Sequence, residues 1–365
     1  MTLVLDAISR SVAGEVHSSN ISLTLERGTL NVLLGPTLSG KTSLMRLMAG
    51  LDKPDSGHLS VDGRDVTGVP VGRRNVAMVY QQFINYPTLS VFENIASPLR
   101  VARLDRSEID SRVRDAARLL RLEPMLDRTP AQLSGGQQQR TAIARALVKR
   151  ADLVLMDEPL ANLDYKLREE LREELPKIFA SSGAIFVYAT TEPSEALLLG
   201  GNTATLSEGR VTQFGPTPHL YRDPFDLATA EVFSDPPLNT LTAEKRGSAF
   251  AIQGAPDFAA AGLLARLGDG RYTLGFRAHH LELTKPVAPA LEIAGTVSVS
   301  EITGSESFIH LAMHGHNFVA LTQGIHRLEI GEALTGYVDP AHLFAFDPSG
   351  RCVMAPASVQ GGAVA

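Results

Sequence analysis

Short apolar runs alternate with helical patterns along the first part of the chain, and this alternation predicts an α/β domain. Residues 31–34 form a short apolar run that ends at Gly35, which predicts a buried strand leading into a glycine turn. A helix is expected to follow over 41–51. Similar apolar runs predict two further buried strands, at 153–156 and 184–188.

Two longer helices are predicted from apolar residues that recur about every 3.6 positions. The first is expected to begin at a Ser107 cap. Its buried face would carry Ile109, Val113, Ala116 and Leu120. The buried face of the second would carry Leu167, Leu171, Leu175 and Ile178. Pro176 should bend or shorten this second helix, because proline has no backbone N–H to donate.

The end of the chain has a different pattern. Paired prolines within 234–238 predict a linker, because they continue neither a helix nor a central strand. Beyond it, short segments such as 271–276 are separated by Gly, Asp and Pro, as is typical of a small barrel or sandwich. We therefore expect a first domain over 1–235 and a small all-β domain over 236–355. The last residues, 356–365, are predicted to be a disordered tail.

Composition narrows the classes of function. The 365 residues carry a formal net charge of −6 without an evident basic stripe, which argues against nucleic-acid binding. The single cysteine, Cys352, excludes a disulfide framework and fits a reducing compartment. The N-terminus does not match a secretory signal, and no run approaches the roughly 18 to 20 apolar residues of a membrane helix. Any work at a membrane is therefore expected to go through a partner.

A phosphate-binding loop is the clearest chemical motif. The segment Gly35-Pro36-Thr37-Leu38-Ser39-Gly40-Lys41-Thr42 matches the pattern G-x-x-x-x-G-K-[ST]. Its glycines let backbone N–H groups turn towards phosphate oxygens, and the next helix adds its positive N-terminal end. Lys41 can reach the outer phosphates, and Thr42 can hold Mg²⁺. The predicted strand–loop–helix context disfavours the alternative of a glycine turn with an exposed lysine.

Two acids end the apolar strand at 153–156. Asp157 at the strand tip can bind Mg²⁺ through water, and Glu158 can orient or deprotonate an attacking water. Many strands end in an acid, so this pattern alone is weak. After a phosphate loop it is the expected second half of a nucleotide site.

A third motif lies between these two, in the sequence Leu133-Ser134-Gly135-Gly136-Gln137. Ser134 can cap a helix whose N-terminus carries only glycines, so that an anion can approach closely. A plain glycine turn before an amphipathic helix is the alternative.

The order of these motifs resembles that of ABC ATPases, in which LSGGQ is the family signature. The phosphate loop, Gln81, LSGGQ, the acid-tipped strand and Asn162-Leu-Asp164 occur in the family's order. The flanking sequence looks like the ATPase subunit of maltose- and glycerol-phosphate-type importers. Residues 275–280 and 338–344 are similar to the OB-type regulatory domain of those subunits. The implied fold is an α/β P-loop nucleotide-binding domain followed by that all-β domain.

The resemblance also implies cofactors, site residues and partners. ATP would contact the loop from Gly35 to Ser43, and Mg²⁺ would be held by Thr42, Gln81 and Asp157. Two ATPases would face each other head to tail, so that each ATP also meets Ser134, Gly135, Gly136 and Gln137 of the other chain, with Asp164 communicating across the interface. Catalysis would fall to Glu158 and Lys41. Two permease subunits and, indirectly, a solute-binding protein would complete an importer, with this chain at the cytoplasmic face of the membrane.

Two positions depart from the family pattern. Related ATPases stack an aromatic ring on adenine near the N-terminus, whereas Val12 occupies about that position and no Phe, Tyr or Trp precedes Tyr80. Losing such a stack removes about 1–3 kcal/mol, unless Val12 or a neighbour packs on adenine instead. The second departure is Thr191, which stands where the family places a histidine against the γ-phosphate. A threonine hydroxyl is shorter and cannot become cationic, and losing such a contact typically costs on the order of 10²- to 10³-fold in rate.

We hypothesise that this subunit pairs with a second, complete ATPase, and that its own site is slow. A homodimer with an unusual switch residue is the competing interpretation. A largely non-hydrolytic, regulatory ATPase-like subunit is the alternative function. ABC proteins of translation or DNA repair are disfavoured, because neither a second cassette nor a long coiled coil is present. The transported solute is expected to be a carbohydrate or polyol, and the resemblance favours a glycerol-type importer.

Overall fold

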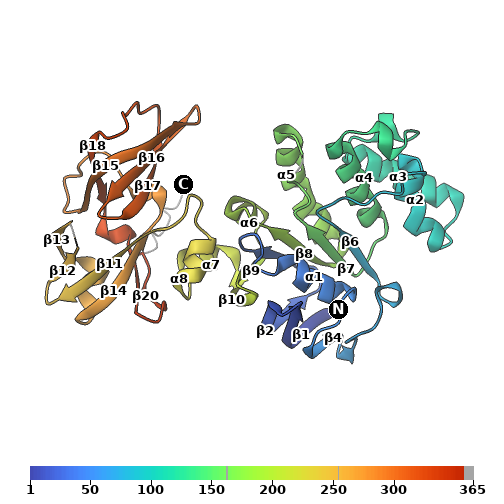
Figure 1. Ribbon diagram of the computed structural model, residues 1–365. Helices are drawn as coiled ribbons and strands as arrows, with labels where there is room; N and C mark the ends of the chain where they lie inside the picture. The colour runs from blue at the N-terminus through green and yellow to red at the C-terminus, as the bar shows by residue number, and fades with distance from the viewer. Residues whose placement is uncertain (162, 254, 357–365) are drawn as a thin grey trace, which may run out of the picture. The chain divides into compact units, whose positions relative to one another are not determined.

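The chain divides into two compact units in the computed structural model (Figure 1). The first covers Met1–Thr217 and the second Pro218–Ala365. The structure describes residues 1–161, 163–253 and 255–356. The predicted tail at 356–365 lies, apart from its first residue, outside the described residues, as does Asn162.

A largely parallel sheet forms the centre of the first unit. Its strand order is β10-β9-β3-β8-β7-β6, and all pairs are parallel except that between β9 and the edge strand β10. The strands are β3 (Leu30–Leu34), β6 (Val76–Val79), β7 (Leu153–Asp157), β8 (Ile185–Thr190), β9 (Asn202–Ser207) and β10 (Arg210–Pro216). The residues of β3, β7 and β8 are buried throughout, which explains their continuous apolar runs.

A second, antiparallel sheet completes the core of this unit. It has the order β2-β1-β4-β5 and consists of β1 (Thr2–Val12), β2 (Glu15–Glu26), β4 (Ser56–Val61) and β5 (Arg64–Asp65). Helix α1 (Lys41–Ala49) shares one buried cluster with residues of both sheets. It ends earlier than the predicted residue 51 because Gly50 takes a left-handed conformation with φ 76° and caps it.

Three helices gather in the middle of the sequence (Figure 1). They are α2 (Val91–Val101), α3 (Arg106–Leu119) and α4 (Gly135–Val148), and each contacts the other two. The predicted buried face of α3 is confirmed, but its predicted cap is wrong. Asp105 occupies the N-cap position, and Ser107 lies inside the first turn.

Two more helices flank the sheet strand β8. Helix α5 (Tyr165–Ser182) contains Pro176 and continues past it. The predicted shortening of the helix at this proline is therefore wrong. The missing N–H of one residue removes a single hydrogen bond, and the buried Leu167, Leu171 and Leu175 hold the helix in place. Helix α6 (Pro193–Leu199) follows β8 after a short turn.

The second unit contains two antiparallel sheets that enclose one apolar core. The first has the order β13-β12-β11-β14-β19-β20, with strands β11 (Asn239–Arg246), β12 (Ala249–Ile252), β13 (Ala255–Ala259), β14 (Gly270–Phe276), β19 (Phe344–Phe346) and β20 (Cys352–Met354). The second has the order β17-β16-β15-β18, with β15 (Leu291–Ile302), β16 (Glu306–Met313), β17 (His316–Gln323) and β18 (Ala333–Val338). Short 3₁₀ turns lie at Val71–Arg73, Glu123–Met125, Pro130–Gln132, Gly262–Arg266, Ala278–His280 and Pro340–His342.

The compact units divide earlier in the chain than the boundary expected between 235 and 236. Helices α7 (Thr217–Arg222) and α8 (Leu227–Val232) pack with the β strands that follow them. The Arg277 guanidinium lies 3.7 Å from the centre of the Tyr221 ring and donates a 2.6 Å hydrogen bond to the Tyr221 carbonyl. The prolines at 236 and 237 therefore lie inside the second unit.

Candidate nucleotide site

The phosphate loop joins β3 to α1, as predicted. Gly40 has φ 101°, and a Cβ atom there would lie 2.4 Å from the His17 carbonyl oxygen. A Cβ atom on Gly35 would lie 2.4 Å from the Leu206 carbonyl oxygen. Both glycines are therefore required by close backbone approach, which shapes a loop that can wrap around phosphate oxygens.

Lys41 is buried beneath this loop. Its Nζ donates hydrogen bonds of 2.6 Å to the Gly35 carbonyl and 2.9 Å to the Pro36 carbonyl. Burial lowers the pKa of Lys41, while the charges of Glu158 and Asp157 oppose that shift. The loop carbonyls thus hold the ammonium group in place beside the space where phosphates would bind.

Oxygen ligands suited to a magnesium ion meet at the end of β7. The Thr42 hydroxyl donates a 2.8 Å hydrogen bond to the Asp157 carboxylate, which is 2% exposed. Burial raises the pKa of Asp157, and the hydrogen bond from Thr42 and the charge of Lys41 lower it. Hydroxyl and carboxylate oxygens are the hard donors that Mg²⁺ prefers, so these two residues fit the ion.

Glu158 follows directly and adopts a left-handed conformation with φ 45°. Its backbone N–H donates to the Ala189 carbonyl, and its carboxylate accepts a 3.0 Å hydrogen bond from the Gln81 side chain. Burial raises the pKa of Glu158, whereas the charge of Lys41 lowers it. A half-buried acid with a raised pKa is suited to accept a proton from water.

A cavity of about 370 Å³ joins these groups. It is lined by Glu15, Val16, His17, Thr37, Leu38, Gly40, Lys41, Thr42, Ser43, Gln81 and Glu158. Val12 is not among them, and its assignment as the adenine contact stays a prediction. In the β1–β2 hairpin Val12 pairs with Glu15 and Ser11 pairs with Val16, and the residues that line the cavity are those at the start of β2. Sequence position alone did not reveal this choice.

His17 was missed as a site residue. Its Nδ1 lies 2.8 Å from the Ser43 Oγ, directly after the phosphate loop. The ring was visible in the sequence as the nearest aromatic group to the loop, but its contact depends on the pairing of β1 and β2.

The LSGGQ motif begins helix α4, as predicted. The Ser134 side chain accepts a 3.4 Å hydrogen bond from the Gln137 N–H, and the Gln137 side chain accepts a 2.9 Å bond from the Ser134 N–H. Ser134 and Gly135 are exposed, with Gly136 beside them. None of these residues contributes to the lining of the nucleotide cavity described above, so within one chain the motif faces elsewhere.

Asp164 and Thr191 lie at two turns next to the acid-tipped strand. The Asp164 side chain caps α5 by accepting a 3.0 Å hydrogen bond from the Leu167 N–H. Thr191 is exposed directly after β8, between Thr190 and Glu192. An exposed hydroxyl at this turn provides no cationic group for a phosphate.

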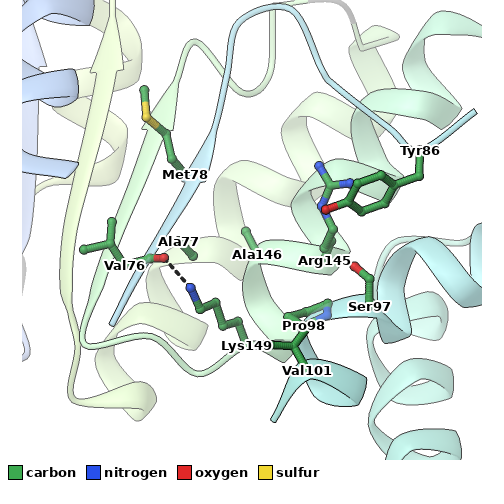
Figure 2. Close-up of a pocket in the computed structure, with 10 residues that line it drawn as sticks. All are labelled: Val76, Ala77, Met78, Tyr86, Ser97, Pro98, Val101, Arg145, Ala146 and Lys149. Carbon is green, nitrogen blue, oxygen red and sulfur yellow. Dashed lines mark hydrogen bonds between the residues drawn. The ribbon is translucent and has the colours of Figure 1, made fainter. Parts of the chain in front are cut away.

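A second cavity lies among β6, α2 and α4 (Figure 2). The Arg145 guanidinium stacks over the Tyr86 ring at 5.2 Å and donates to the Ile84 carbonyl, and the Lys149 Nζ donates a 2.6 Å bond to the Val76 carbonyl. Burial lowers the pKa of Arg145. At the rim Val101 is 84% exposed, so this cavity combines cations with apolar surface.

Known proteins share both units of the chain. Residues 18–161 match the model of the ABC transporter family, and residues 274–346 match that of the TOBE domain. The sn-glycerol-3-phosphate import ATP-binding protein UgpC of Paraburkholderia xenovorans (strain LB400) is 34% identical over 360 residues, covering 96% of this chain and 98% of the relative. The alpha-glucoside transport ATP-binding protein AglK of Rhizobium meliloti (strain 1021) is 34% identical over 357 residues, with the same two coverages.

Solved structures agree with these relatives. A dimeric ATP-binding cassette in a post-hydrolysis state, bound to ADP and phosphate, is 28% identical with a TM-score of 0.54, over 59% of this chain and 98% of that one. An ATP-binding subunit of an ABC transporter is 25% identical with a TM-score of 0.56, over 61% of this chain and 92% of that one.

The parallel sheet with its phosphate loop and acid-tipped strand defines a P-loop ATPase of the ABC type. Likeness over nearly the full length then identifies the family: the chain belongs to the ABC transporter family, as an ATP-binding subunit whose ATP hydrolysis is coupled to transport. The predicted OB-type second domain is confirmed by the TOBE match and the all-β second unit.

Proposed function

We propose that this subunit drives import of a carbohydrate or polyol, with a glycerol-type solute as the first choice to test. The near full-length likeness to ATP-binding proteins named for import of sn-glycerol-3-phosphate and transport of alpha-glucosides carries this proposal. The solute itself is selected by other subunits, so the test is to purify the complex from its host. Co-purifying permease and solute-binding proteins would then be assayed with radiolabelled glycerol, glycerol 3-phosphate and alpha-glucosides.

The ATP-bound state would be a head-to-tail pair of cassettes. The phosphates of each ATP would lie on the loop from Gly35 to Ser43 of one chain, and Ser134 to Gln137 of the other chain would cover them. Ser134 and Gly135 are exposed and do not line the nucleotide cavity of their own chain. This supports the arrangement, because only a second chain can bring them to a nucleotide. Asp164 would act across the interface. If ATP binds the closed pair more tightly than the open one, its binding shifts the population towards the closed pair.

Within each site the residues divide the work. Lys41 would leave the loop carbonyls to contact the outer phosphates, and Thr42, Gln81 and Asp157 would hold Mg²⁺, which screens the phosphate charge. Glu158 would take the proton of the attacking water. The hydrogen bond from Gln81 supports this role, because it fixes the direction of the carboxylate.

Contact with the permease is assigned to the cavity of Figure 2. Within the described ranges no helix has the length and apolar character needed to cross a bilayer. By analogy with import ATP-binding proteins, the chain would lie peripherally at the cytoplasmic face, held by two permease subunits. Val101→Asp should abolish co-purification with the membrane fraction while ATP binding persists. Leu198→Asp, which changes a 62% exposed leucine on α6, is the matched control. Equal loss in both variants would argue against this docking site.

We further propose that the composite site containing Lys41 and Thr191 is slow, and that a second, complete ATPase provides the main hydrolytic site. The exposed threonine where the family pattern has histidine supports this. Glu158→Gln in this chain should then reduce the ATPase activity of the complex much less than the matching change in the partner. A complex with one ATPase species and full activity would contradict the heterodimer. Loss of all activity from the change in this chain would contradict the slow site, and no effect at all would favour the purely regulatory role.

A further inference from the structure

Thr190 fixes the backbone just before the switch position. Its carbonyl accepts a 3.4 Å hydrogen bond from the Gly35 N–H of the phosphate loop. Its hydroxyl donates a 2.7 Å bond to the Glu195 carboxylate and accepts a 3.0 Å bond from the Glu192 N–H. The turn carrying Thr191 is therefore held from both sides.

Glu195 anchors this turn from within the core. It is 4% exposed, and its carboxylate also accepts hydrogen bonds from the Tyr188 hydroxyl at 3.0 Å and from the Arg172 guanidinium at 3.0 Å. Burial raises the pKa of Tyr188 well above its ordinary value, so that its hydroxyl remains a donor at neutral pH. A buried carboxylate with three donors is a rigid support, because losing any donor leaves charge unsatisfied.

Glu192 meets the first turns of α5 on the exposed side of the Glu195 anchor. Its carboxylate accepts a 2.9 Å hydrogen bond from the Arg172 Nη2, the same nitrogen that donates to Glu195, and lies 3.7 Å from the Arg168 guanidinium. The glutamate side chain is 43% exposed, so it can move while the Glu195 anchor stays in place.

Arg168 connects this glutamate to the segment that follows the catalytic acid. Its Nη2 donates hydrogen bonds of 3.3 Å to the Leu163 carbonyl and 3.5 Å to the Ala161 carbonyl. Those residues lie between Glu158 and the α5 cap Asp164. One guanidinium thus touches both the switch turn and the segment that the proposed function directs towards a second cassette.

We infer that the Glu192–Arg168 contact is a positioning link that transmits displacement of the Ala161 and Leu163 carbonyls to the switch residue Thr191. The inference rests on the proposed function for the direction in which Ala161 and Leu163 face, but not for the contact itself. When a second cassette moves the Ala161 and Leu163 carbonyls, Arg168 moves with them and pulls Glu192. The turn then pivots on Thr190, because the Glu195 anchor holds that end.

Hydrogen exchange followed by mass spectrometry tests the link on the purified full chain without nucleotide. Exchange measures local opening, so it reports on each segment separately. Glu192→Gln should accelerate exchange about two- to fivefold, the range for breaking a partly exposed ion pair, in peptides covering both 159–165 and 189–194. Arg168→Gln should do the same from the other side, and Glu192→Asp, which keeps the charge, should restore most of the protection.

Glu169→Gln is the matched control on the same helix. Glu169 pairs with Arg172 at 2.6 Å and contacts neither turn directly. Its removal should leave exchange at 159–165 unchanged. If Glu192→Gln accelerates exchange only in 189–194 while 159–165 keeps its wild-type exchange rate, the contact stabilises one segment only and the inference fails. The inference also fails if Arg168→Gln accelerates exchange in 159–165 but leaves exchange in 189–194 unchanged.

Hydrolysis provides a second, independent readout. In a Thr191→His background, Glu192→Gln should reduce the kcat for ATP about two- to fivefold while KM stays within experimental error. A change in KM alone would contradict a positioning role. Since the exchange experiment needs neither a partner nor turnover, it decides the link even if the slow-site proposal is wrong.

Discussion

The Gln81 side-chain amide donates a 3.0 Å hydrogen bond to the Glu158 carboxylate. Gln81 follows the edge strand β6, and Glu158 follows its parallel neighbour β7, so the carboxyl ends of two paired strands bring the residues together. The segment after Gln81 leads to Tyr86 at the cavity of Figure 2. A partner that binds there would be connected to Glu158, the proposed general base, through a few residues of chain.

Replacing Gln81 should change the pH dependence of hydrolysis. Its hydrogen bond lowers the pKa of Glu158, against the larger upward shift caused by burial. Gln81→Ala should therefore raise that pKa further. Because the base works when deprotonated, the acidic limb of the kcat/KM profile should move to higher pH, and activity at neutral pH should fall up to about tenfold. An unshifted acidic limb would show that Gln81 does not act on Glu158.

Crowding at Gly40 predicts a selective loss of nucleotide binding. Gly40→Ala would place a methyl group 2.4 Å from the His17 carbonyl, in a left-handed conformation. Gly63 also has a positive φ, 75°, but a Cβ atom there would meet no atom within 4 Å. Gly63→Ala therefore controls for backbone strain without crowding. The control should lose about 1 kcal/mol of stability and keep its affinity for ATP. Gly40→Ala should lose ATP binding in isothermal titration, and normal affinity there would show that the loop can shift.

Placing a histidine at position 191 should accelerate hydrolysis at the site that we propose to be slow. Thr191→His would supply a side chain that can reach the γ-phosphate and carry a charge. The ATPase rate of this site should rise, up to on the order of 10²-fold if the contact acts in the transition state. Thr191→Val removes the hydroxyl at similar volume and should leave the rate near that of the wild type. A rate that histidine does not raise would mean that the threonine is not the limiting feature.

Acid should weaken the second unit through His280. Burial, together with the charges of His279, His342 and Arg277, lowers the pKa of His280 to about 3. An unfolded histidine titrates near 6.5, so between these values the unfolded state binds a proton that the folded state rejects. The contribution of neutral His280 to the stability of the second unit is therefore fully present above about pH 6.5 and is lost as the pH falls towards 3.

The measurement is urea unfolding of the second unit within the full chain between pH 7 and pH 5. His280→Phe, which keeps a ring to stack on His342 at the present 4.1 Å, should flatten the pH dependence. His58→Phe, a change of an exposed histidine in the first unit, should leave it unchanged. Equal slopes for wild type and His280→Phe would rule out His280 as the source.

Local patterns in the sequence already determined much of this protein. The strand, loop and helix around Lys41 follow from an apolar run, two glycines and a helical period, all within a short stretch of chain. The acid-tipped strand and the Ser134 cap are equally local. Such features depend on steric and hydrogen-bonding rules between near neighbours, so they can be predicted without knowing what packs against them.

Only the tertiary structure decided which distant residues meet. The register of the first hairpin places Val16 and His17 at the nucleotide cavity instead of Val12. Packing of α7 and α8 moves the division between the units ahead of the paired prolines. The contacts of Arg168 with Glu192 and with the Leu163 carbonyl join turns that follow different strands. These outcomes depend on strand pairing and on the competition of many side chains for the same buried space, which no periodicity along the chain encodes.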